Sequence, residues 1–216
     1  MIRPYWTSAY LNHRVQNAWY RLRHPRAPWL TPEAVAFLDK WLGRNHVGIE
    51  WGTGRSTLWL ARRIGRLTSI EHDPAWFERT CRGLDKLSVG RVRILMRETS
   101  AQDYAGITDE FEDGGLDFAL VDGVSALRDA CTLAAISKIR EGGLLILDDA
   151  QRYLPLDVVV PNAIGPRAEP LTPVWKQAAC RLASWKCQMT CDGLRATVIW
   201  RRPVAASLMK TGGPGS

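Results

Sequence analysis

Three aspartates that follow apolar segments are the residues of this sequence best suited to chemistry. Asp122 comes directly after residues 116–121 (LDFALV), and Asp148 and Asp149 come after residues 144–147 (LLIL). Because the carboxyl ends of parallel strands meet at one crevice, the three carboxylates are expected to converge there. They would repel one another unless they were protonated, hydrogen-bonded or bridged by a cation, and hard oxygen ligands of this kind suit Mg²⁺. All three are therefore candidate metal ligands.

The same aspartates could act without a metal. Asp122 or Asp149 could be a general base that takes the proton of an acceptor hydroxyl, and His72 is a further candidate for that role. A histidine next to a cofactor-binding acid is equally suited to a structural hydrogen bond. The pair Asp148-Asp149 could also cap a turn, because aspartate favours turns. The sequence leaves these alternatives open.

A glycine-rich turn further upstream predicts a ligand site. Residues 47–57 read VGIEWGTGRST, in which an apolar run ends at Glu50 and is followed by Gly52 and Gly54. Glycines let backbone amides approach a ligand closely. The dinucleotide fingerprint requires a third glycine where this chain has Thr57. Glu50 favours a ligand that carries an ammonium group, such as S-adenosylmethionine (SAM), and leaves a nicotinamide dinucleotide as the alternative.

A second acid supports a nucleoside-containing ligand. Residues 67–71 (LTSIE) read as a strand that ends at Glu71, roughly 20 residues after the loop, where a carboxylate meets ribose hydroxyls in such folds. The other interpretation is a solvated strand end.

Four motifs in this order resemble class I SAM-dependent methyltransferases. They are residues 49–57, 69–76 (SIEHDPAW), 117–123 (DFALVDG) and 141–150 (EGGLLILDDA), within a region of about residues 45–150. The closest likeness is to the small group with a G-x-G-R-S-T loop and a paired Asp after the fifth strand. The resemblance implies a seven-stranded sheet with SAM across the carboxyl ends of the first strands. The cofactor-binding residues that it implies are Glu50, Gly52, Thr53, Gly54, Ser56, Thr57, Glu71, His72, Ser100, Ala101 and Asp122.

The resemblance also bears on the aspartates. In metal-dependent O-methyltransferases that this chain resembles, an acid after strand four and an Asp pair after strand five hold the metal, at the positions of Asp122, Asp148 and Asp149. The metal lowers the pKa of a bound hydroxyl. The catechol-type pattern has a lysine shortly after the first acid, whereas this chain has residues 123–125 (GVS) there. The departure argues against catechol chemistry and leaves Mg²⁺ as a possible cofactor.

The hydrophobic pattern predicts the elements that position these residues. The fold class is α/β: a Rossmann-like, seven-stranded, mostly parallel sheet with helices on both faces and an antiparallel C-terminal hairpin. Helices are expected at 32–42 with Thr31 as the cap, at 58–64, from 74 onward with Trp76 and Phe77 beneath the helix, and at 130–140. Strands are expected at 91–96, 116–121 and 144–147, with Gly142 and Gly143 breaking the chain before the last of these, and the hairpin at 185–191 and 195–200. We divide the chain into a basic aromatic helical segment (1–30), a methyltransferase domain (31–203) and a flexible tail (204–216).

The positive charge lies at the ends of the chain. Lys and Arg number 29 and Asp and Glu 22, a net charge of +7. Residues 1–32 hold five arginines and no acid, and residues 201–216 hold three basic residues and no acid, so the core is near neutral and nucleic acid is an improbable partner. Trp6, Tyr10 and His13 share one helical face. This segment could lie on an anionic membrane or an acidic partner, pack over the cofactor site, or form a dimer contact.

The remaining composition is that of a globular protein, with 46% apolar and 24% charged residues. No apolar run reaches the ~20 residues that span a bilayer, no signal peptide is evident, and five scattered cysteines indicate reduced thiols, so a cytoplasmic location is expected. Residues 151–176 hold five prolines and form either an acceptor lid or a rigid connector.

The sequence thus predicts a SAM-dependent O-methyltransferase that acts on a small-molecule, sugar or lipid-linked hydroxyl. The alternatives are an NAD-dependent oxidoreductase and a non-catalytic scaffold of the same fold that docks through its basic ends.

Overall fold

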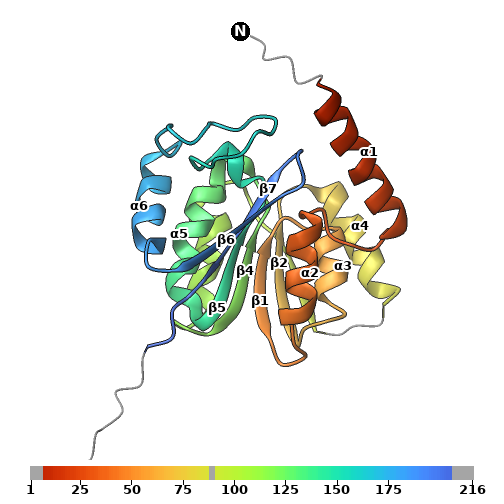
Figure 1. Cartoon of the computed structure of the whole chain (residues 1–216). Helices are drawn as coiled ribbons and strands as arrows, with labels where there is room; N and C mark the ends of the chain where they lie inside the picture. Colours follow the sequence, from red (N-terminus) through yellow and green to blue (C-terminus); the bar gives the residue numbers. More distant parts are fainter. Residues whose placement is uncertain (1–6, 88–90, 206–216) are drawn as a thin grey trace, which may run out of the picture.

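A single mixed sheet organises the computed structural model, which describes residues 7–87 and 91–205. The strand order is β3-β2-β1-β4-β5-β7-β6 (Figure 1). Strands β1 to β5 are parallel, and β7 runs antiparallel to both β5 and β6. The strands are β1 (Val47–Trp51), β2 (Arg66–Glu71), β3 (Val92–Met96), β4 (Leu116–Val121), β5 (Ile139–Leu147), β6 (Lys186–Cys191) and β7 (Ala196–Arg201). The predicted Rossmann-like sheet with an antiparallel C-terminal hairpin is confirmed.

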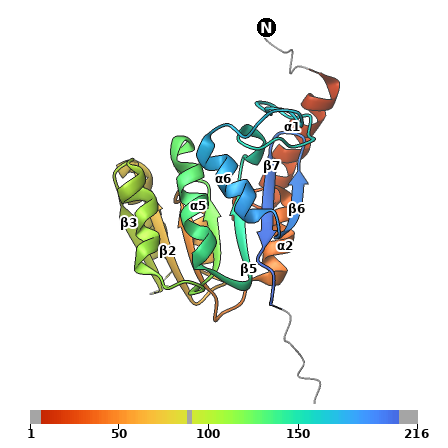
Figure 2. The ribbon, with the colours of Figure 1, turned by 90° about the vertical axis from the view of Figure 1, so that its left-hand side faces the viewer.

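Helices cover both faces of the sheet (Figure 2). They are α2 (Pro32–Trp41), α3 (Arg55–Leu60) and α4 (Pro74–Asp85) on one face, and α5 (Arg128–Lys138) and α6 (Pro173–Leu182) on the other. Successive strand residues point to opposite faces. Accordingly, Phe118 and Leu120 of β4 pack with Leu38 of α2, whereas Ala119 and Val121 pack in the cluster that contains Ala135 of α5.

The expected helix at residues 130–140 was wrong at its C-terminal end. Helix α5 stops at Lys138, and β5 begins at Ile139. Gly142 and Gly143 therefore lie inside β5, where its pairing with β4 is irregular, instead of separating a helix from a strand. A Cβ on Gly143 would lie 2.6 Å from the Asp117 carbonyl oxygen, so the two strands approach here as closely as glycine permits.

Three further local expectations were wrong. Helix α3 starts at Arg55, directly after the glycine loop, and not at residue 58. Trp76 of α4 does not lie beneath its helix: it is 40% exposed and its ring faces Gly54. Thr31 precedes α2 as expected, but its hydroxyl bonds to the Thr190 hydroxyl of β6 instead of capping the helix.

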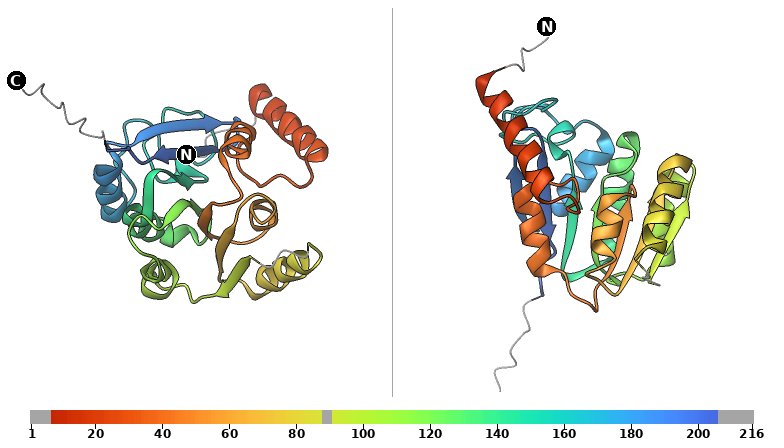
Figure 3. Two further views of the ribbon diagram at one scale, coloured as in Figure 1. Left: turned by 90° about the horizontal axis from the view of Figure 1, so that it is seen from below. Right: turned by 90° about the vertical axis from the view of Figure 1, so that its right-hand side faces the viewer.

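Helix α1 (Ser8–Arg23) lies outside the sheet layers, beside the β6–β7 turn (Figure 3). The Asn17 amide donates to the Asp192 carboxylate in that turn. The opposite side of α1 carries a row of exposed apolar side chains, Leu11, Val15, Trp19 and Leu22. We call these four residues the α1 stripe. Trp6, which was expected on the face of Tyr10 and His13, lies outside the described residues, as do residues 206–216 of the expected tail.

The proline-rich segment joins η4 (Ala150–Arg152) to α6 as an anchored connector. Tyr153 is buried, stacks on Trp175 and shares a hydrogen bond of 2.6 Å with Ser125. The Thr172 hydroxyl donates to the Asp129 carboxylate at 2.6 Å. Tyr153, Leu154 and Val160 therefore belong to the core, which supports the connector interpretation, whereas Val159 and Leu171 are exposed. Within residues 7–87 and 91–205, no helix combines the length and the apolar character that crossing a bilayer requires.

Candidate functional site

The site begins at Glu50, which the sheet buries completely at the end of β1. The Ser69 hydroxyl of the neighbouring strand donates to Glu50 Oε1. Burial raises the pKa of the Glu50 carboxyl to about 7, and the nearby Ser69, Thr57 and Ser56 hydroxyls oppose that increase. Glu50 Oε2 has no hydrogen-bond partner among the described residues. A buried carboxylate oxygen without a donor is costly, which marks this position as a receptor for a cationic group.

The glycine loop follows Glu50 in the conformation that its glycines allow. Gly52 and Gly54 have φ of 90° and 148°, which side chains rarely adopt. A Cβ on Gly52 would lie 2.8 Å from the carbonyl oxygen of Asp122 at the end of β4. The Gly54 amide donates to the Thr57 hydroxyl at 3.0 Å. The loop is therefore packed tightly against β4 on one side and open toward Trp76 on the other.

Glu71 ties the loop to the end of β2. Its Oε2 accepts from the amide and the hydroxyl of Thr53, both at 2.8 Å, and its Oε1 accepts from the amides of His72 and Asp73 at 2.8 and 2.9 Å. The His72 ring nitrogen Nδ1 lies 3.0 Å from Oε1. A carboxylate offers about four lone-pair sites, so the chain itself already occupies Glu71.

Arg128 joins the carboxyl ends of β4 and β5 by hydrogen bonds. Its side chain is buried and donates to the Asp122 carboxylate at 2.8 Å, to the Asp122 carbonyl at 3.1 Å and to the Asp148 carbonyl at 2.7 Å. Burial raises the pKa of the Asp122 carboxyl, and the charge of Arg128 opposes that increase. Sequence reasoning missed Arg128; its only signal was a basic residue at the start of an otherwise apolar helix.

The three aspartates do not converge on a shared cation. The Thr197 hydroxyl donates to Asp148 Oδ1 at 2.7 Å, and Arg195 Nη1 lies 3.6 Å from Oδ2. Burial, and then the charges of Asp122 and Asp149, raise the pKa of Asp148 to about 8. Asp149 has a left-handed backbone with φ of 51°, and its carboxylate lies 3.8 Å from Arg152.

Mg²⁺ does not fit the aspartates as they stand. Among the described residues, no group of three or more His, Cys, Asp or Glu side chains is arranged to hold a metal ion. The expected ligand set of Asp122, Asp148 and Asp149 is therefore not assembled among these residues, and Mg²⁺ stays a prediction. Arginines supply the positive charge that the sequence assigned to a metal: Arg128 pairs with Asp122, and Arg195 lies beside Asp148.

Two cavities open at this edge of the sheet. The first, which we call the loop cavity, has a volume of about 430 Å³ and is lined in part by Thr53, Gly54, Ser56, Thr80 and Asp122. Four of the predicted cofactor-binding residues thus face one space. That volume is in the range of small-molecule sites.

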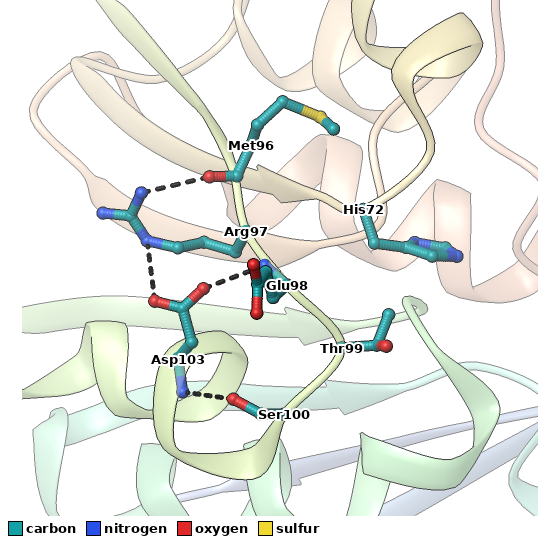
Figure 4. A pocket seen from close by; sticks show the side chains of 7 residues that line it. All are labelled: His72, Met96, Arg97, Glu98, Thr99, Ser100 and Asp103. Carbon is teal, nitrogen blue, oxygen red and sulfur yellow. Dashed lines mark hydrogen bonds and ion pairs between the residues drawn. The ribbon is translucent and has the colours of Figure 1, made fainter.

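The second cavity, of about 580 Å³, lies after β2 and β3 and is more open. We call it the β3-end cavity. His72, Glu98, Thr99, Ser100 and Asp103 are among the residues that line it (Figure 4). The Ser100 hydroxyl accepts from the Asp103 amide at 3.1 Å, which caps a short π-helix (Ala101–Ala105). Ala101 is exposed and is absent from the lining. Glu71 contacts Thr53 of the loop cavity and His72 of the β3-end cavity, and so links the two.

A sequence comparison decides the class of this site. Residues 49–150 match the family model described as a methyltransferase domain. This part of the chain, slightly less than half of its length, is similar to a methyltransferase domain. The match begins in β1, three residues before the first loop glycine, and ends just after Asp149. It therefore contains Glu50, Glu71, Asp122, Arg128 and the paired aspartates. No curated protein matches the chain.

Solved structures share the fold at low sequence identity. The O-methyltransferase TomG from Streptomyces achromogenes, solved with SAM, is 18% identical, with 78% of this chain and 77% of that chain covered and a TM-score of 0.55. SMU.1697c from Streptococcus mutans, solved with S-adenosylhomocysteine (SAH), is 13% identical, with coverages of 77% and 93% and a TM-score of 0.52.

A precorrin 8W decarboxylase from Methanobacterium thermoautotrophicum is 20% identical, with 83% of this chain and 95% of that chain covered and a TM-score of 0.53. At these identities the neighbours show the fold of the methyltransferase domain, and their named activities belong to them. The family match over residues 49–150 supports the prediction of a methyltransferase, and the solved structures confirm its fold. The roles of individual site residues stay predictions.

Proposed function

We propose that this chain transfers the methyl group of SAM to a hydroxyl oxygen of a small-molecule acceptor. The observation that carries the proposal is Glu50 Oε2, a fully buried carboxylate oxygen without a hydrogen-bond partner at the foot of the glycine loop. An ammonium group such as that of methionine would satisfy it, whereas the pyrophosphate of a nicotinamide dinucleotide would meet a like charge.

The residues present fit SAM from end to end. Glu50, with the loop residues Gly52, Thr53 and Gly54, would hold the methionine part, and the hydroxyls of Ser56 and Thr57 lie beside the Glu50 carboxyl. SAM when bound supplies an activated methyl group on a sulfonium. The protein's part is to hold the acceptor oxygen in line with that group and to exclude water.

The adenosine part would occupy the β3-end cavity, next to His72, Ser100 and Ala101. The hydrogen bonds that Glu71 already accepts limit its part in binding the adenosine. Because its four accepting positions are used, ribose hydroxyls can bind Glu71 only if the Thr53 hydroxyl gives up its bond. We therefore assign Glu71 first to holding the loop and second to the ribose.

For the acceptor we assign Asp122 as the group nearest to the reacting oxygen, because it lines the loop cavity. Its carboxylate would accept the proton of the hydroxyl, with Arg128 stabilising the charge. Asp149 is the second candidate base, since its carboxylate is partly exposed. No step is routed through a metal, because the donor set does not fit one.

Calorimetric titration of SAH into the purified chain, with NADH in parallel, tests the proposal. We expect SAH to bind and NADH not to bind. Glu50→Gln should weaken SAH binding about tenfold to a hundredfold, because a hydrogen bond to a charged group is worth about 1.5–3 kcal/mol. Glu78→Gln on α4, whose carboxylate is exposed and pairs with Arg82, is the matched control and should bind as the unmodified chain does.

Binding of NADH alone would overturn the assignment in favour of the oxidoreductase, and no binding of either ligand would favour a scaffold. With SAH binding in hand, Asp122→Asn and Asp149→Asn should be compared by turnover on a panel of hydroxyl acceptors, including sugars and lipid-linked sugars. We place this activity in the cytoplasm, a proposal supported by five cysteines that are all free.

A further inference from the structure

Positive charge collects in the loop cavity beyond what the SAM site needs. Four guanidinium groups line it, and they come from three separate parts of the chain: the linker after α1, the segment of α3 and its following turn, and α4. We call these four residues, Arg26, Arg55, Arg62 and Arg79, the arginine cluster. The cavity has one acidic lining residue, Asp122, and its carboxylate is already paired with Arg128.

The arginine cluster has no carboxylate partner. Among the described residues, no Asp or Glu oxygen lies within 4 Å of any of its four guanidinium groups, whereas surface arginines nearby are paired: Arg63 with Asp39 at 2.6 Å and Arg82 with Glu78 at 3.5 Å. The cluster makes other contacts instead. Arg62 donates to the Leu58 carbonyl at 2.8 Å, while Arg55 and Arg79 lie over tryptophan rings.

Like charges gathered in one cavity oppose each other. The pKa of Arg62 is lowered by burial first, and then by the charges of Arg26 and Arg63. An anion in the cavity would remove this repulsion and gain charge-assisted hydrogen bonds. The carboxylate of a bound methionine moiety carries one negative charge, which leaves most of the cluster without a partner.

Two tryptophans define the rest of the cavity. Trp29 lies beneath Arg55 with the guanidinium carbon 5.6 Å from the ring centroid, and Trp76 lies beneath Arg79 at 5.2 Å. Both rings are partly exposed in the cavity wall. The contact between a guanidinium group and an aromatic ring orients both groups. The cavity therefore offers a flat apolar surface next to positive charges that are held in place.

We propose that the acceptor carries a phosphate group, and that the arginine cluster binds this phosphate while the acceptor hydroxyl lies toward Asp122. The proposal rests on the methyltransferase function above and names its class of substrate: a phosphorylated small molecule with a flat or apolar body. Guanidinium forks match phosphate oxygens, and a multiply charged group uses several arginines where a single carboxylate uses one. The cavity volume of about 430 Å³ is that of a small-molecule site, which favours a small molecule over a nucleic acid or a protein surface.

Calorimetric titration of inorganic pyrophosphate into the full chain, with saturating SAH, tests the proposal. We expect pyrophosphate to bind, and Arg26→Gln and Arg79→Gln each to weaken that binding at least tenfold. Arg82→Gln is the matched control, because Arg82 lies on the same helix as Arg79, is largely exposed, pairs with Glu78 and does not line the cavity. SAH affinity should be unchanged in Arg82→Gln, and all three variants should unfold at the temperature of the unmodified chain, which shows that each is folded.

Failure of pyrophosphate to bind, or an equal loss in Arg79→Gln and Arg82→Gln, would overturn the phosphate proposal while SAH binding still supports the methyltransferase. Failure of SAH to bind would overturn the proposed function itself. Sedimentation with phosphatidylcholine vesicles, with and without phosphatidic acid, distinguishes the source of the phosphate. If the chain sediments with vesicles that contain phosphatidic acid, and Arg79→Gln abolishes this sedimentation, the acceptor phosphate belongs to a lipid. If the chain binds pyrophosphate but does not sediment in this way, the acceptor is a soluble phosphate ester.

Discussion

At the scale of single residues, the site contains a buried acid, Glu50, whose burial lowers the stability of the fold. Glu50 is fully buried and its carboxyl accepts a hydrogen bond at only one oxygen. Removing a carboxylate from water costs several kcal/mol unless it is paired. In the absence of ligand, the unpaired carboxylate oxygen destabilises the folded chain. Such an oxygen is expected of a residue that binds a ligand and not of one that stabilises the fold.

A substitution at Glu50 separates stability from binding. We expect Glu50→Gln to raise the melting temperature at pH 8 by a few degrees, because it removes a buried charge, while it weakens SAH binding. Differential scanning calorimetry at pH 8 measures the first effect and titration with SAH the second. A variant that loses both stability and affinity would show that Glu50 serves the fold.

The loop glycine closest to β4 tolerates no side chain. Gly52→Ala places a Cβ 2.8 Å from the Asp122 carbonyl oxygen in a backbone with φ of 90°. We expect a loss of about 1–3 kcal/mol in the free energy of unfolding, measured with urea, together with a loss of SAH binding. Gly106→Ala is the control, since its Cβ would meet nothing within 4 Å. Equal stability of the two variants would show that the loop can move away from β4.

Some of these residues could be predicted and others could not. Glu50 lies near the end of β1, and the loop glycines and Asp122 follow strands. Apolar runs reveal these strands, so the place of the residues at one edge of the sheet was accessible from sequence. Arg128 was not, because its partners are mainly carbonyl groups of β4 and β5, which leave no mark in the sequence. The sequence suggested Mg²⁺ beside Asp122 for that reason: the cation that the structure pairs with Asp122 is Arg128, which belongs to a helix whose register was unknown.

At the scale of elements, one buried arginine joins the ends of two strands. Arg128→Gln would leave the Asp122 carboxylate without its cation and the Asp148 carbonyl without its donor. We expect a loss of about 3–5 kcal/mol in the free energy of unfolding, measured with urea. In Asp122→Asn with Arg128→Gln, part of that loss should be recovered, because no uncompensated charge remains. Additive losses in the double variant would show that the two side chains act independently.

Helix α1 presents its apolar residues to solvent. The α1 stripe of Leu11, Val15, Trp19 and Leu22 is exposed, and residues 1–32 contain no acid. We expect the chain to sediment with vesicles that contain anionic phospholipid and not with neutral ones. Replacing Leu11 and Leu22 by Ser should reduce retention several-fold, without changing SAH binding. If the chain instead associates with itself in the absence of vesicles, and more so at higher protein concentration, the α1 stripe contacts a second copy of the chain.

The elements themselves were easier to predict than their ends. Strands such as β4 were found because both faces are buried and, apart from Asp117, the residues are apolar. The start of β5 was missed because Gly142 and Gly143 usually interrupt structure, and only the partner strand shows that they form an irregularity within it. Trp76 was placed in the core by its apolar character, although it belongs to a cavity wall.

At the scale of the whole molecule, buried acids tie stability to pH. The pKa of Glu50 is raised to about 7 and that of Asp148 to about 8, so the folded chain holds protons that the unfolded chain has released. Their contribution to stability is complete below the usual pKa of a carboxyl and is lost as the pH rises through 7 and 8. We expect the free energy of unfolding, measured with urea, to fall between pH 5 and pH 8. Glu50→Gln should flatten this fall, and a stability that rises over the same interval would contradict the assignment.

The order of the strands has a consequence for how the chain comes to be folded. Strand β5, with the buried sequence LLIL, has β4 on one side and β7 on the other, and β7 follows some 50 residues later in the chain. Until residues 196–201 are synthesised, β5 has an unpaired edge that can associate with other chains. Two hydrogen bonds near the carboxyl end of β5 also require β7: the Thr197 hydroxyl donates to Asp148, and the Ala196 amide donates to Gln151. A chain that stops before β7 should therefore aggregate, and the last strand both closes the sheet and completes the edge where chemistry takes place.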